Sequence, residues 1–296
     1  MRLLTFEMDG KARLGVQCTG GDNPGGIVDL AAAAPALPST WPEILDGFLL
    51  GDVEAIVRTV PPGDLLDEGS LTYLAPIVRP PKLLCVGLNY HSHAAEVGLD
   101  APEHPIFFVR FPTSITGHRR NLVRPTASEQ FDYEAELAVV IGKGGRHISN
   151  AAALDHVAGY SICNDGSLRD FQFRGGQWTL GKNFDASGSL GPVIVTADEL
   201  PLGAAGLQIT CRLNDQVVQD SNTSDMIFDV PALIEAASQV MTLEPGDVII
   251  TGTPPGVGVA RKPPLWMKPG DRIEVNIEDI GSLTNPIVDA GTLTFM

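Results

Sequence analysis

The stretch that decides the fold of this chain is Phe131-Asp132-Tyr133-Glu134-Ala135-Glu136-Leu137-Ala138-Val139-Val140-Ile141-Gly142. Its second half is an apolar, β-branched run that ends at a glycine, which predicts a β-strand. Side chains alternate between the two faces of a strand, so Asp132, Glu134 and Glu136 are expected on one face. The opposite face is then expected to carry Tyr133, Leu137, Val139 and Ile141.

Three acidic side chains on one face of a strand repel one another. The repulsion is roughly 4 kcal/mol per pair at 4 Å and an effective dielectric constant of 20. Such a face is tolerated if water surrounds it, as at a solvated strand end, or if a cation binds there. Carboxylate oxygens are hard ligands that favour Mg²⁺, Mn²⁺ or Ca²⁺. The strand by itself leaves both alternatives open.

Length and composition exclude several classes of protein. The chain has 296 residues, of which 44% are hydrophobic and 19% charged, an ordinary globular balance. The net charge of −16 is spread along the chain, so nucleic-acid binding, which needs a basic face, is not expected. No apolar run approaches membrane-spanning length, so we expect no membrane association. The ligand class that remains is a small molecule.

The N-terminus and the cysteines predict the compartment. Glu7 comes too early for the apolar core of a signal peptide. The four cysteines are scattered without a CxxC pair, which favours free thiols over disulfides or zinc. Together these features predict a cytoplasmic protein.

Residues 1–75 predict a small N-terminal α/β domain without evident chemistry. Its strands are expected at residues 3–8, 13–17 and 26–30, and its helices near residues 40–51 and 52–60. Thr40 is the expected cap of the first helix, with Pro42 in its first turn and Gly51 at its end. The proline-rich segment at 75–81 is the best boundary, so a second domain is expected over residues 82–296.

The second domain begins with a strand at 82–88 and then a short helix that Ser92 can cap. His93 and Glu96 lie three residues apart in that helix, so they are neighbours on one face. A carboxylate beside a histidine orients the ring and raises its basicity, which makes this pair a candidate general base. An exposed surface pair is the alternative.

Other candidate side chains stand at strand ends and in loops. Arg110 is the lone charge of an apolar strand and is expected either to reach out to solvent or to face an anion. Asp165 follows an apolar strand, a position from which a side chain can point into a site. Arg169 and Gln172 lie on a predicted helix, where helical spacing is expected to put them on a face with Asp165. Lys182 follows in a glycine-rich loop.

The remainder of the chain is mostly β, with one helix capped by Asp229 and opened by Pro231. The loop at 253–258 is rich in glycine but lacks the Gly-Lys-Ser/Thr ending of a P-loop. Its backbone amides can still bind a carboxylate.

Five blocks in this order together resemble the fumarylacetoacetate hydrolase family, from Lys82 to the C-terminus. They are Val86-Gly87-Leu88-Asn89-Tyr90 with His93 and Glu96; Asp132 to Leu137; Gly159-Tyr160 with Asn164-Asp165 and Arg169-Asp170; Gly181-Lys182-Asn183-Phe184-Asp185; and Thr251-Gly252-Thr253-Pro254 with Gly256-Val257-Gly258.

The resemblance implies an α+β fold, a mixed β-sandwich or β-roll, in a protein that is typically a homodimer. It also implies a divalent metal, usually Mg²⁺ and sometimes Mn²⁺ or Ca²⁺. The residues that match the family's functional positions are Glu134, Glu136 and Asp165 for the metal, His93, Glu96 and Lys182 for catalysis, and Arg169, Gln172 and Thr253 for substrate.

The expected activity is that of a divalent-metal-dependent hydrolase, which cleaves a C–C bond in an acylpyruvate, a 2,4-dioxo acid. The metal would stabilise the enolate, and His93 held by Glu96 would activate the water. The alternatives are an isomerase or decarboxylase of 2-oxo diacids, and a catalytically silent binder in which the metal only stabilises the fold.

Overall fold

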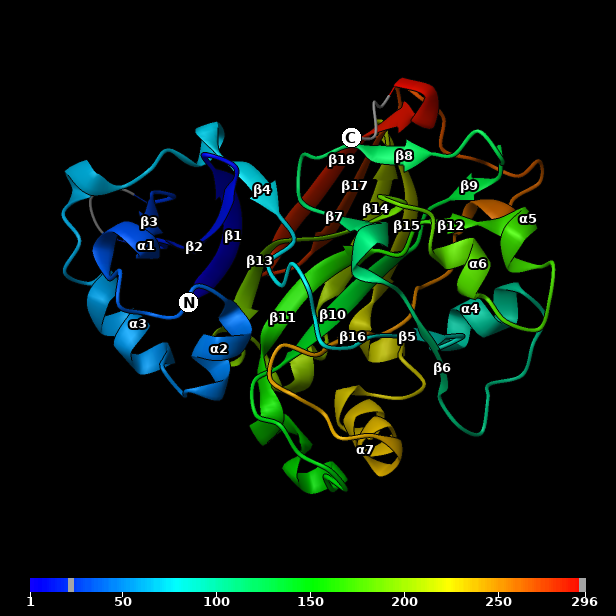
Figure 1. The fold of residues 1–296 in the computed structure, drawn as a ribbon. Helices are drawn as coiled ribbons and strands as arrows, with labels where there is room; N and C mark the ends of the chain where they lie inside the picture. Colours follow the sequence, from blue (N-terminus) through cyan, green and yellow to red (C-terminus); the bar gives the residue numbers. More distant parts are fainter. Residues whose placement is uncertain (21–23, 293–296) are drawn as a thin grey trace.

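The acidic stretch leads into strand β10 (Ala135–Ile141), and every residue of that strand is buried. In the computed structural model, which describes residues 1–20 and 24–292, β10 lies between β11 (Val157–Asn164) and β16 (Val248–Ile250). These three strands form the centre of the largest sheet (Figure 1). The predicted strand is therefore confirmed from Ala135 onward.

The largest sheet of the described residues has eleven strands, in the order β3-β2-β1-β13-β11-β10-β16-β5-β6, with β4 paired to β1 and β7 to β13. Pairing is mostly antiparallel, but β16 runs parallel to β5 and β13 runs parallel to β7, so the sheet is mixed. The remaining strands of this sheet are β1 (Arg2–Met8), β2 (Lys11–Gln17), β3 (Ile27–Asp29), β4 (Thr72–Leu74), β5 (Leu83–Gly87), β6 (Ile106–Val109), β7 (Ile115–Thr116) and β13 (Gly188–Thr196).

A five-stranded sheet covers one face of the centre of the large sheet, and the described residues also include a two-stranded ribbon. The five-stranded sheet is β15 (Gln216–Asn222), β14 (Gln208–Leu213), β17 (Arg272–Ile277), β18 (Gly281–Asp289) and β8 (Leu122–Arg124), in that order. The ribbon is β9 (Phe131–Asp132) with β12 (Ser167–Leu168).

The alternation of side chains along β10 fills two separate cores. Leu137 and Val139 belong to a core that includes Ile209 and Val275 of the five-stranded sheet. Ala138 and Val140 point the other way, into a core that includes Trp41 of the N-terminal region. A fully buried leucine or valine side chain contributes ~1.5–3 kcal/mol, so this register is strongly specified. Glu136 lies on the same face as Ala138, as the alternation predicts.

The N-terminal region joins the large sheet edge to edge, because Arg2 and Leu3 of β1 pair with Val195 and Ile194 of β13. Its helices are α1 (Leu30–Ala33), α2 (Trp41–Asp46) and α3 (Leu50–Val57). The Thr40 hydroxyl caps α2 by accepting from the Glu43 amide, as predicted.

The predicted end of α2 at Gly51 is wrong. The helix ends at Asp46, with Gly47 as its C-cap, and Phe48 adopts a left-handed backbone conformation with φ +55°. Phe48 is 75% exposed, so its apolar side chain does not contribute to the core.

Three short helices gather at one end of the large sheet, where Figure 1 shows α4, α5 and α6 side by side. They are α4 (His91–Glu96), α5 (Arg169–Gln172) and α6 (Thr179–Lys182). The longest described helix, α7 (Val230–Val240), is capped by Asp229 and has a proline in its first turn, as predicted. Among the described residues, none of the helices has the length and apolar character needed to cross a bilayer. The predicted α+β class is confirmed.

Candidate metal and substrate site

Three carboxylates converge at the end of the sheet where α4, α5 and α6 gather. Glu134, Glu136 and Asp165 each offer an oxygen, and these oxygens all lie within 4.8 Å of one another. The three residues are only 6%, 1% and 0% exposed. The solvated strand end that the sequence left open is therefore wrong, and the acids form a buried cluster.

Strand pairing explains why residues thirty positions apart meet. Ala135 of β10 pairs with Asn164 at the end of β11. The Asp165 amide then donates to the Glu134 carbonyl at 2.9 Å, and the Asn164 Oδ1 accepts from the Glu134 amide at 3.1 Å. The chain thus holds Glu134 and Asp165 side by side at the point where both strands give way to loops.

Asp132 does not join this cluster, which corrects the expectation of one continuous acidic face. Strand β9 ends at Asp132 and β10 begins at Ala135, so the alternation is interrupted between them. The Asp132 carboxylate instead accepts from the amides of Gly258 and Val259, and from Arg169 Nε at 2.8 Å. Asp132 fixes the loop after β16 and orients Arg169.

Arg110 faces an anion, the second of its two predicted environments. Its Nη1 lies 2.5 Å from the Asp165 Oδ1, and both side chains are completely buried. The other donors of the guanidinium are used by the Gly166 carbonyl and by Ser114 and Ser187. Arg110 thereby fixes the orientation of the Asp165 carboxylate.

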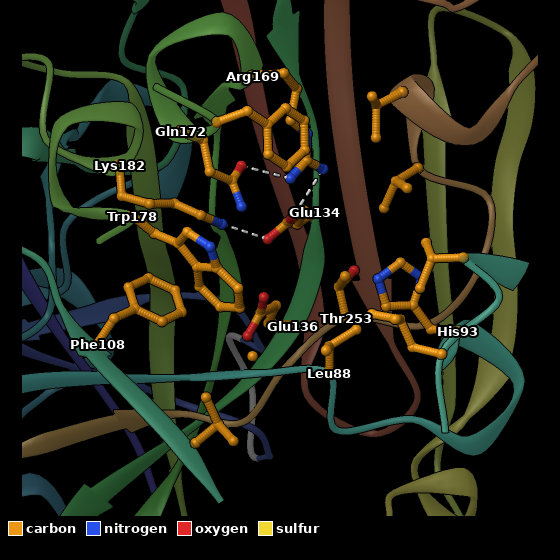
Figure 2. Close-up of a pocket in the computed structure, with 17 residues that line it drawn as sticks. Leu88, His93, Phe108, Glu134, Glu136, Arg169, Gln172, Trp178, Lys182 and Thr253 are labelled. Carbon is orange, nitrogen blue, oxygen red and sulfur yellow. Dashed lines mark hydrogen bonds and ion pairs between the residues drawn. The ribbon is translucent and has the colours of Figure 1, made fainter. Parts of the chain in front are cut away.

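Lys182 and Arg169 bring two further cations to the carboxylates. Lys182 Nζ contacts the Glu134 Oε2 at 2.6 Å and the Asp165 Oδ2 at 2.5 Å. Arg169 Nη2 lies 2.7 Å from the Glu134 Oε1, and its Nη1 donates to Gln172 at 2.8 Å. Figure 2 shows Lys182, Gln172 and Arg169 along one side of the pocket.

The position of Lys182 depends on Gly181. Helices α5 and α6 approach so closely that a Cβ at Gly181 would lie 2.5 Å from the backbone nitrogen of Gln172. A larger residue would separate the two helices and move Lys182 away from Glu134.

The prediction that Asp165 shares a helix face with Arg169 and Gln172 is wrong. Helix α5 begins at Arg169, so Asp165 is not part of it. The three residues are brought near one another by the chain between β11 and α5.

The carboxylates differ in their electrostatic environment. Burial raises the pKa of Glu134, but Lys182 and Arg169 outweigh it and hold that pKa at about 2. Burial raises the pKa of Glu136 well above its usual value, and the charges of Asp165 and Glu134 raise it further. Burial alone would lower the pKa of Lys182, but Asp165 and Glu134 raise it overall, so the ammonium stays charged.

The charges around the cluster fit a divalent cation. Four buried carboxylates, with Asp132 included, face three cationic side chains, Arg110, Arg169 and Lys182. Within residues 1–20 and 24–292, Glu136 makes no ion pair with a protein cation, and it accepts a hydrogen bond from the Gly252 amide at 2.5 Å. Buried charges are stable only when they are paired or bound to a metal, and all the donor atoms here are hard oxygens.

His93 reaches the pocket from the opposite side, as Figure 2 shows. Its Nδ1 lies 3.0 Å from the Glu96 Oε2, and the Glu96 Oε1 accepts from the Gly256 amide at 2.9 Å. Burial raises the pKa of Glu96, but the contacts with His93 and Gly256 lower it overall, so it stays a carboxylate. His93 is only 8% exposed, which excludes the exposed surface pair.

Ser92 does not cap the helix, contrary to the prediction. Helix α4 begins one residue earlier, at His91, with Tyr90 in the cap position and without a side-chain cap. Ser92 instead donates from its amide and hydroxyl to Asp225, in the turn after β15. This contact holds the helix that carries His93 against the rest of the fold.

Thr253 lines the pocket, and the residue that positions it was not predicted from the sequence. The Thr253 hydroxyl donates to the Ala135 carbonyl at 3.0 Å and accepts from Gln219 at 2.9 Å. Gln219 is buried, and its Oε1 accepts from the Ala135 amide. The burial of β15 does not alternate at this point, because Val218 and Gln219 are both buried, so no strand pattern marked Gln219.

The pocket encloses about 190 Å³. Three aromatic side chains that the sequence analysis did not single out also line it, Phe108, Phe173 and Trp178. The sequence thus predicted all the charged residues of this lining and none of its aromatic ones.

Residues 82–288 match the family described as fumarylacetoacetate (FAA) hydrolase C-terminal. The chain belongs to this family. It is 43% identical to a mitochondrial oxaloacetate tautomerase of Bos taurus, over 97% of this chain and 92% of that protein. It is 44% identical to a mitochondrial oxaloacetate tautomerase of Homo sapiens, over 90% of this chain and 85% of that protein.

Among solved structures of the family, a maleylpyruvate hydrolase from Sphingobium, in complex with manganese(II) and pyruvate, is 31% identical. It superposes with a TM-score of 0.78 and covers 98% of this chain and 99% of that one. A 2-hydroxyhepta-2,4-diene-1,7-dioate isomerase from Mycobacterium marinum is 34% identical, with a TM-score of 0.76 and coverage of 99% and 100%. Family members of different activity thus share this fold.

The predicted cytoplasmic location is contradicted by these relatives. The proteins from Bos taurus, Homo sapiens and Rattus norvegicus, at 43% to 44% identity, are named as mitochondrial. The prediction used the absence of a signal-peptide core and of paired cysteines, and a reducing organelle satisfies both criteria as well as the cytoplasm does.

Proposed function

We propose that this protein is a divalent-metal-dependent enzyme that interconverts the keto and enol forms of a small 2-oxo diacid such as oxaloacetate. The observation that carries the proposal is the arrangement of the pocket, with a buried acidic cluster on one side and His93 on the other. The oxaloacetate tautomerases at 43% and 44% identity support this reaction over the hydrolysis expected from the sequence.

Glu134, Glu136 and Asp165 would hold the metal, because their oxygens lie close enough to share one ion. Mg²⁺ is the proposed ion, and Mn²⁺ and Ca²⁺ are the alternatives with the same preference for oxygen ligands. When bound, such an ion supplies Lewis-acid polarisation of a carbonyl oxygen. The manganese ion in the maleylpyruvate hydrolase structure supports a divalent ion in this family.

The side chains around the metal site would bind and orient the substrate. Lys182 and Arg169 carry the positive charge that a dianionic substrate needs in an acidic protein. Gln172 and Thr253 would orient its oxygens, since both line the pocket with polar groups. These interactions would pre-organise the reacting carbon, which is how positioned polar groups lower a barrier.

His93 would move the proton. In the keto-to-enol direction its Nε2 takes a proton from the carbon next to the ketone, and the electron pair of that C–H bond forms the C=C bond. The ketone oxygen then gains a proton from solvent while His93 gives up its proton to solvent, which yields the enol with no net change in protons, and the reverse reaction returns a proton from His93 to carbon. Glu96 would keep the ring in the required orientation by accepting a hydrogen bond from the His93 Nδ1.

Hydrolysis of the C–C bond of an acylpyruvate is the second candidate. The His93–Glu96 pair favours it, because the same base can take a proton from water, and so does the likeness to maleylpyruvate hydrolase. Decarboxylation of the diacid would use the same metal site without the hydrolytic water. A silent binder is a weaker alternative, because a metal that only stabilises the fold does not need a base.

Spectrophotometry of oxaloacetate with Mg²⁺ and with EDTA tests the proposal, with products identified by mass. Loss of enol absorbance at unchanged mass, abolished by EDTA, supports the tautomerase. Two acids from an acylpyruvate would indicate hydrolysis, and CO₂ would indicate decarboxylation. Metal-dependent binding without turnover of any of these acids would indicate the silent binder.

A homodimer remains part of the proposal, as the family resemblance implies. Sedimentation equilibrium at several protein concentrations measures the subunit number, and a monomer at every concentration would contradict it.

A further inference from the structure

The pocket has two chemically different parts. The charged residues of its lining, Glu134, Glu136, Arg169 and Lys182, lie together at the sheet end. Much of the remaining lining is apolar, and comprises Val86, Leu88, Val97, Leu99, Phe108, Phe173, Trp178, Val257 and Val259. A four-carbon diacid needs only the charged part, so the apolar part has a separate consequence for the choice of substrate.

Trp178 forms the part of the apolar wall that lies next to the charged residues. Figure 2 shows its indole beside Lys182 and Phe108, across the pocket from Leu88 and His93. It packs edge-to-face on Phe108, with ring centroids 5.4 Å apart and an interplanar angle of 73°. Lys182 Nζ in turn lies 5.1 Å from the centre of the Phe108 ring. The wall is therefore continuous with the charged cluster.

The indole is held in place by the missing side chain of Gly87. A Cβ at Gly87 would lie 2.1 Å from Trp178 Cζ3, so the ring rests directly on the backbone at the end of β5. Trp178 also occupies the cap position of α6, four residues before Lys182. A ring held between the Gly87 backbone and the Phe108 ring has a definite position, and a substrate must adapt to it.

The apolar part discriminates against charge as well as length. Lys182 and Arg169, the lysine and arginine of the lining, both already pair with Glu134. A carboxylate buried against aliphatic side chains of the lining such as Val97 and Leu99, out of reach of both cations, would lose its hydration without gaining a charged partner. Uncharged carbon chains are favoured there, and each buried methylene adds ~0.8 kcal/mol, about a fourfold gain in affinity.

We propose that Trp178 is a specificity-determining residue that limits the length of the carbon chain attached to the 2-oxo acid group. This inference rests on the proposed function, because it assumes that the charged part binds that group. In the unaltered protein, affinity rises with chain length until the chain meets the indole and then falls. A smaller residue at 178 moves this maximum to longer chains.

The test is binding of straight-chain 2-oxo acids of increasing length to the Mg²⁺-loaded protein, measured by calorimetry. Trp178→Leu and Trp178→Ala are compared with the unaltered protein. We expect the chain of highest affinity to be longer in the leucine variant and longer again in the alanine variant. Each additional accepted methylene should improve binding about fourfold, equivalent to ~0.8 kcal/mol.

Leu180→Ala is the matched control, because Leu180 is a large apolar residue on the same segment. It is 66% exposed and is not part of the pocket lining. The affinities of Leu180→Ala for 2-oxo acids of increasing length should match those of the unaltered protein. If Trp178→Ala does not fold, the leucine variant still decides the question, and thermal unfolding of each variant checks its integrity.

The outcomes separate this inference from the proposed function. A shifted maximum in the Trp178 variants, with the maximum of Leu180→Ala unchanged, supports the role of Trp178. The same maximum in all variants, together with normal binding and turnover, overturns that role alone. Failure of the unaltered protein to bind any 2-oxo acid overturns both the role of Trp178 and the proposed function.

Discussion

Replacing Arg110 by methionine is the sharpest test of how the acidic cluster is held together. Methionine keeps much of the side-chain volume and removes the charge. The substitution takes away the ion pair with Asp165 and the bonds to Gly166, Ser114 and Ser187. Breaking a buried pair from one side typically costs ~3–5 kcal/mol, because the remaining charge is left buried.

The structure indicates that the loss in the free energy of unfolding lies at the lower end of that range. Lys182 still contacts the other oxygen of Asp165 at 2.5 Å, so the carboxylate keeps one cationic partner. We therefore expect a loss of about 3 kcal/mol in the free energy of unfolding, roughly a hundredfold in the folding constant. Because Arg110 orients a proposed metal ligand, we also expect divalent-ion affinity to fall by roughly 10–100-fold.

Urea unfolding monitored by tryptophan fluorescence measures the first quantity, and Mn²⁺ titration calorimetry the second. Arg58→Met is the matched control, because Arg58 pairs with Glu54 on a helix surface and its side chain is 74% exposed. Such a surface pair contributes about 0.3–0.5 kcal/mol. A loss at Arg110 no larger than at Arg58, or an unchanged Mn²⁺ affinity, would refute the reasoning.

Three further predictions concern a base, a ligand and a buried histidine. His93→Ala should lower kcat for oxaloacetate tautomerisation by ~10²–10⁴ while Mg²⁺ binding persists, with His91→Ala, at an exposed position of the same helix, as the control. Glu136→Gln should abolish Mg²⁺ binding in calorimetry. It should also remove a pH-dependent loss of stability from the metal-free protein, because the raised pKa of Glu136 makes folding less favourable as pH rises above 4.5. His118 has its pKa lowered to about 4 by burial and Arg119, so the unfolded chain binds its proton first. Stability from the neutral ring should fall between pH 6.5 and about 4, and urea unfolding of His118→Asn should lack this component.

Each of these predictions has a result that contradicts it. An unchanged kcat in His93→Ala would remove that residue from the proton transfer. Mg²⁺ binding by Glu136→Gln with unaltered affinity would show that the ion is held elsewhere. Parallel pH–stability curves for His118→Asn and the unaltered protein would mean that this ring does not titrate on unfolding.

The strand pattern predicted the centre of the fold and most of the charged site. Alternation from Leu137 to Ile141 is a local property, so it could be determined from sequence alone. The interruption between Asp132 and Ala135 could not, because it arises from pairing of β9 with β12, a contact made by residues further along the chain. Asp132 was therefore wrongly grouped with Glu134 and Glu136.

Partners that are distant in sequence explain what the sequence left open or missed. Arg110 directly follows β6, and its orientation is decided by Asp165, which follows a different strand, β11. Gln219 supports Thr253 from the second sheet, so its role depends on how the two sheets pack. The Trp178 ring fits in the pocket only because Gly87 has no side chain. The two residues are far apart in the sequence, so no local pattern reveals this contact.

The edge-to-edge pairing of β1 with β13 affects how this protein can be divided. The core on that side mixes Leu3, Trp41 and Ile44 with Val140 and Ile250, so its members come from both sides of the proline-rich segment. A fragment cut to the family match at 82–288 would expose an unpaired strand beside bare apolar side chains. Open edges of that kind recruit other strands, and the isolated fragment would self-associate, so expression trials should retain the whole chain.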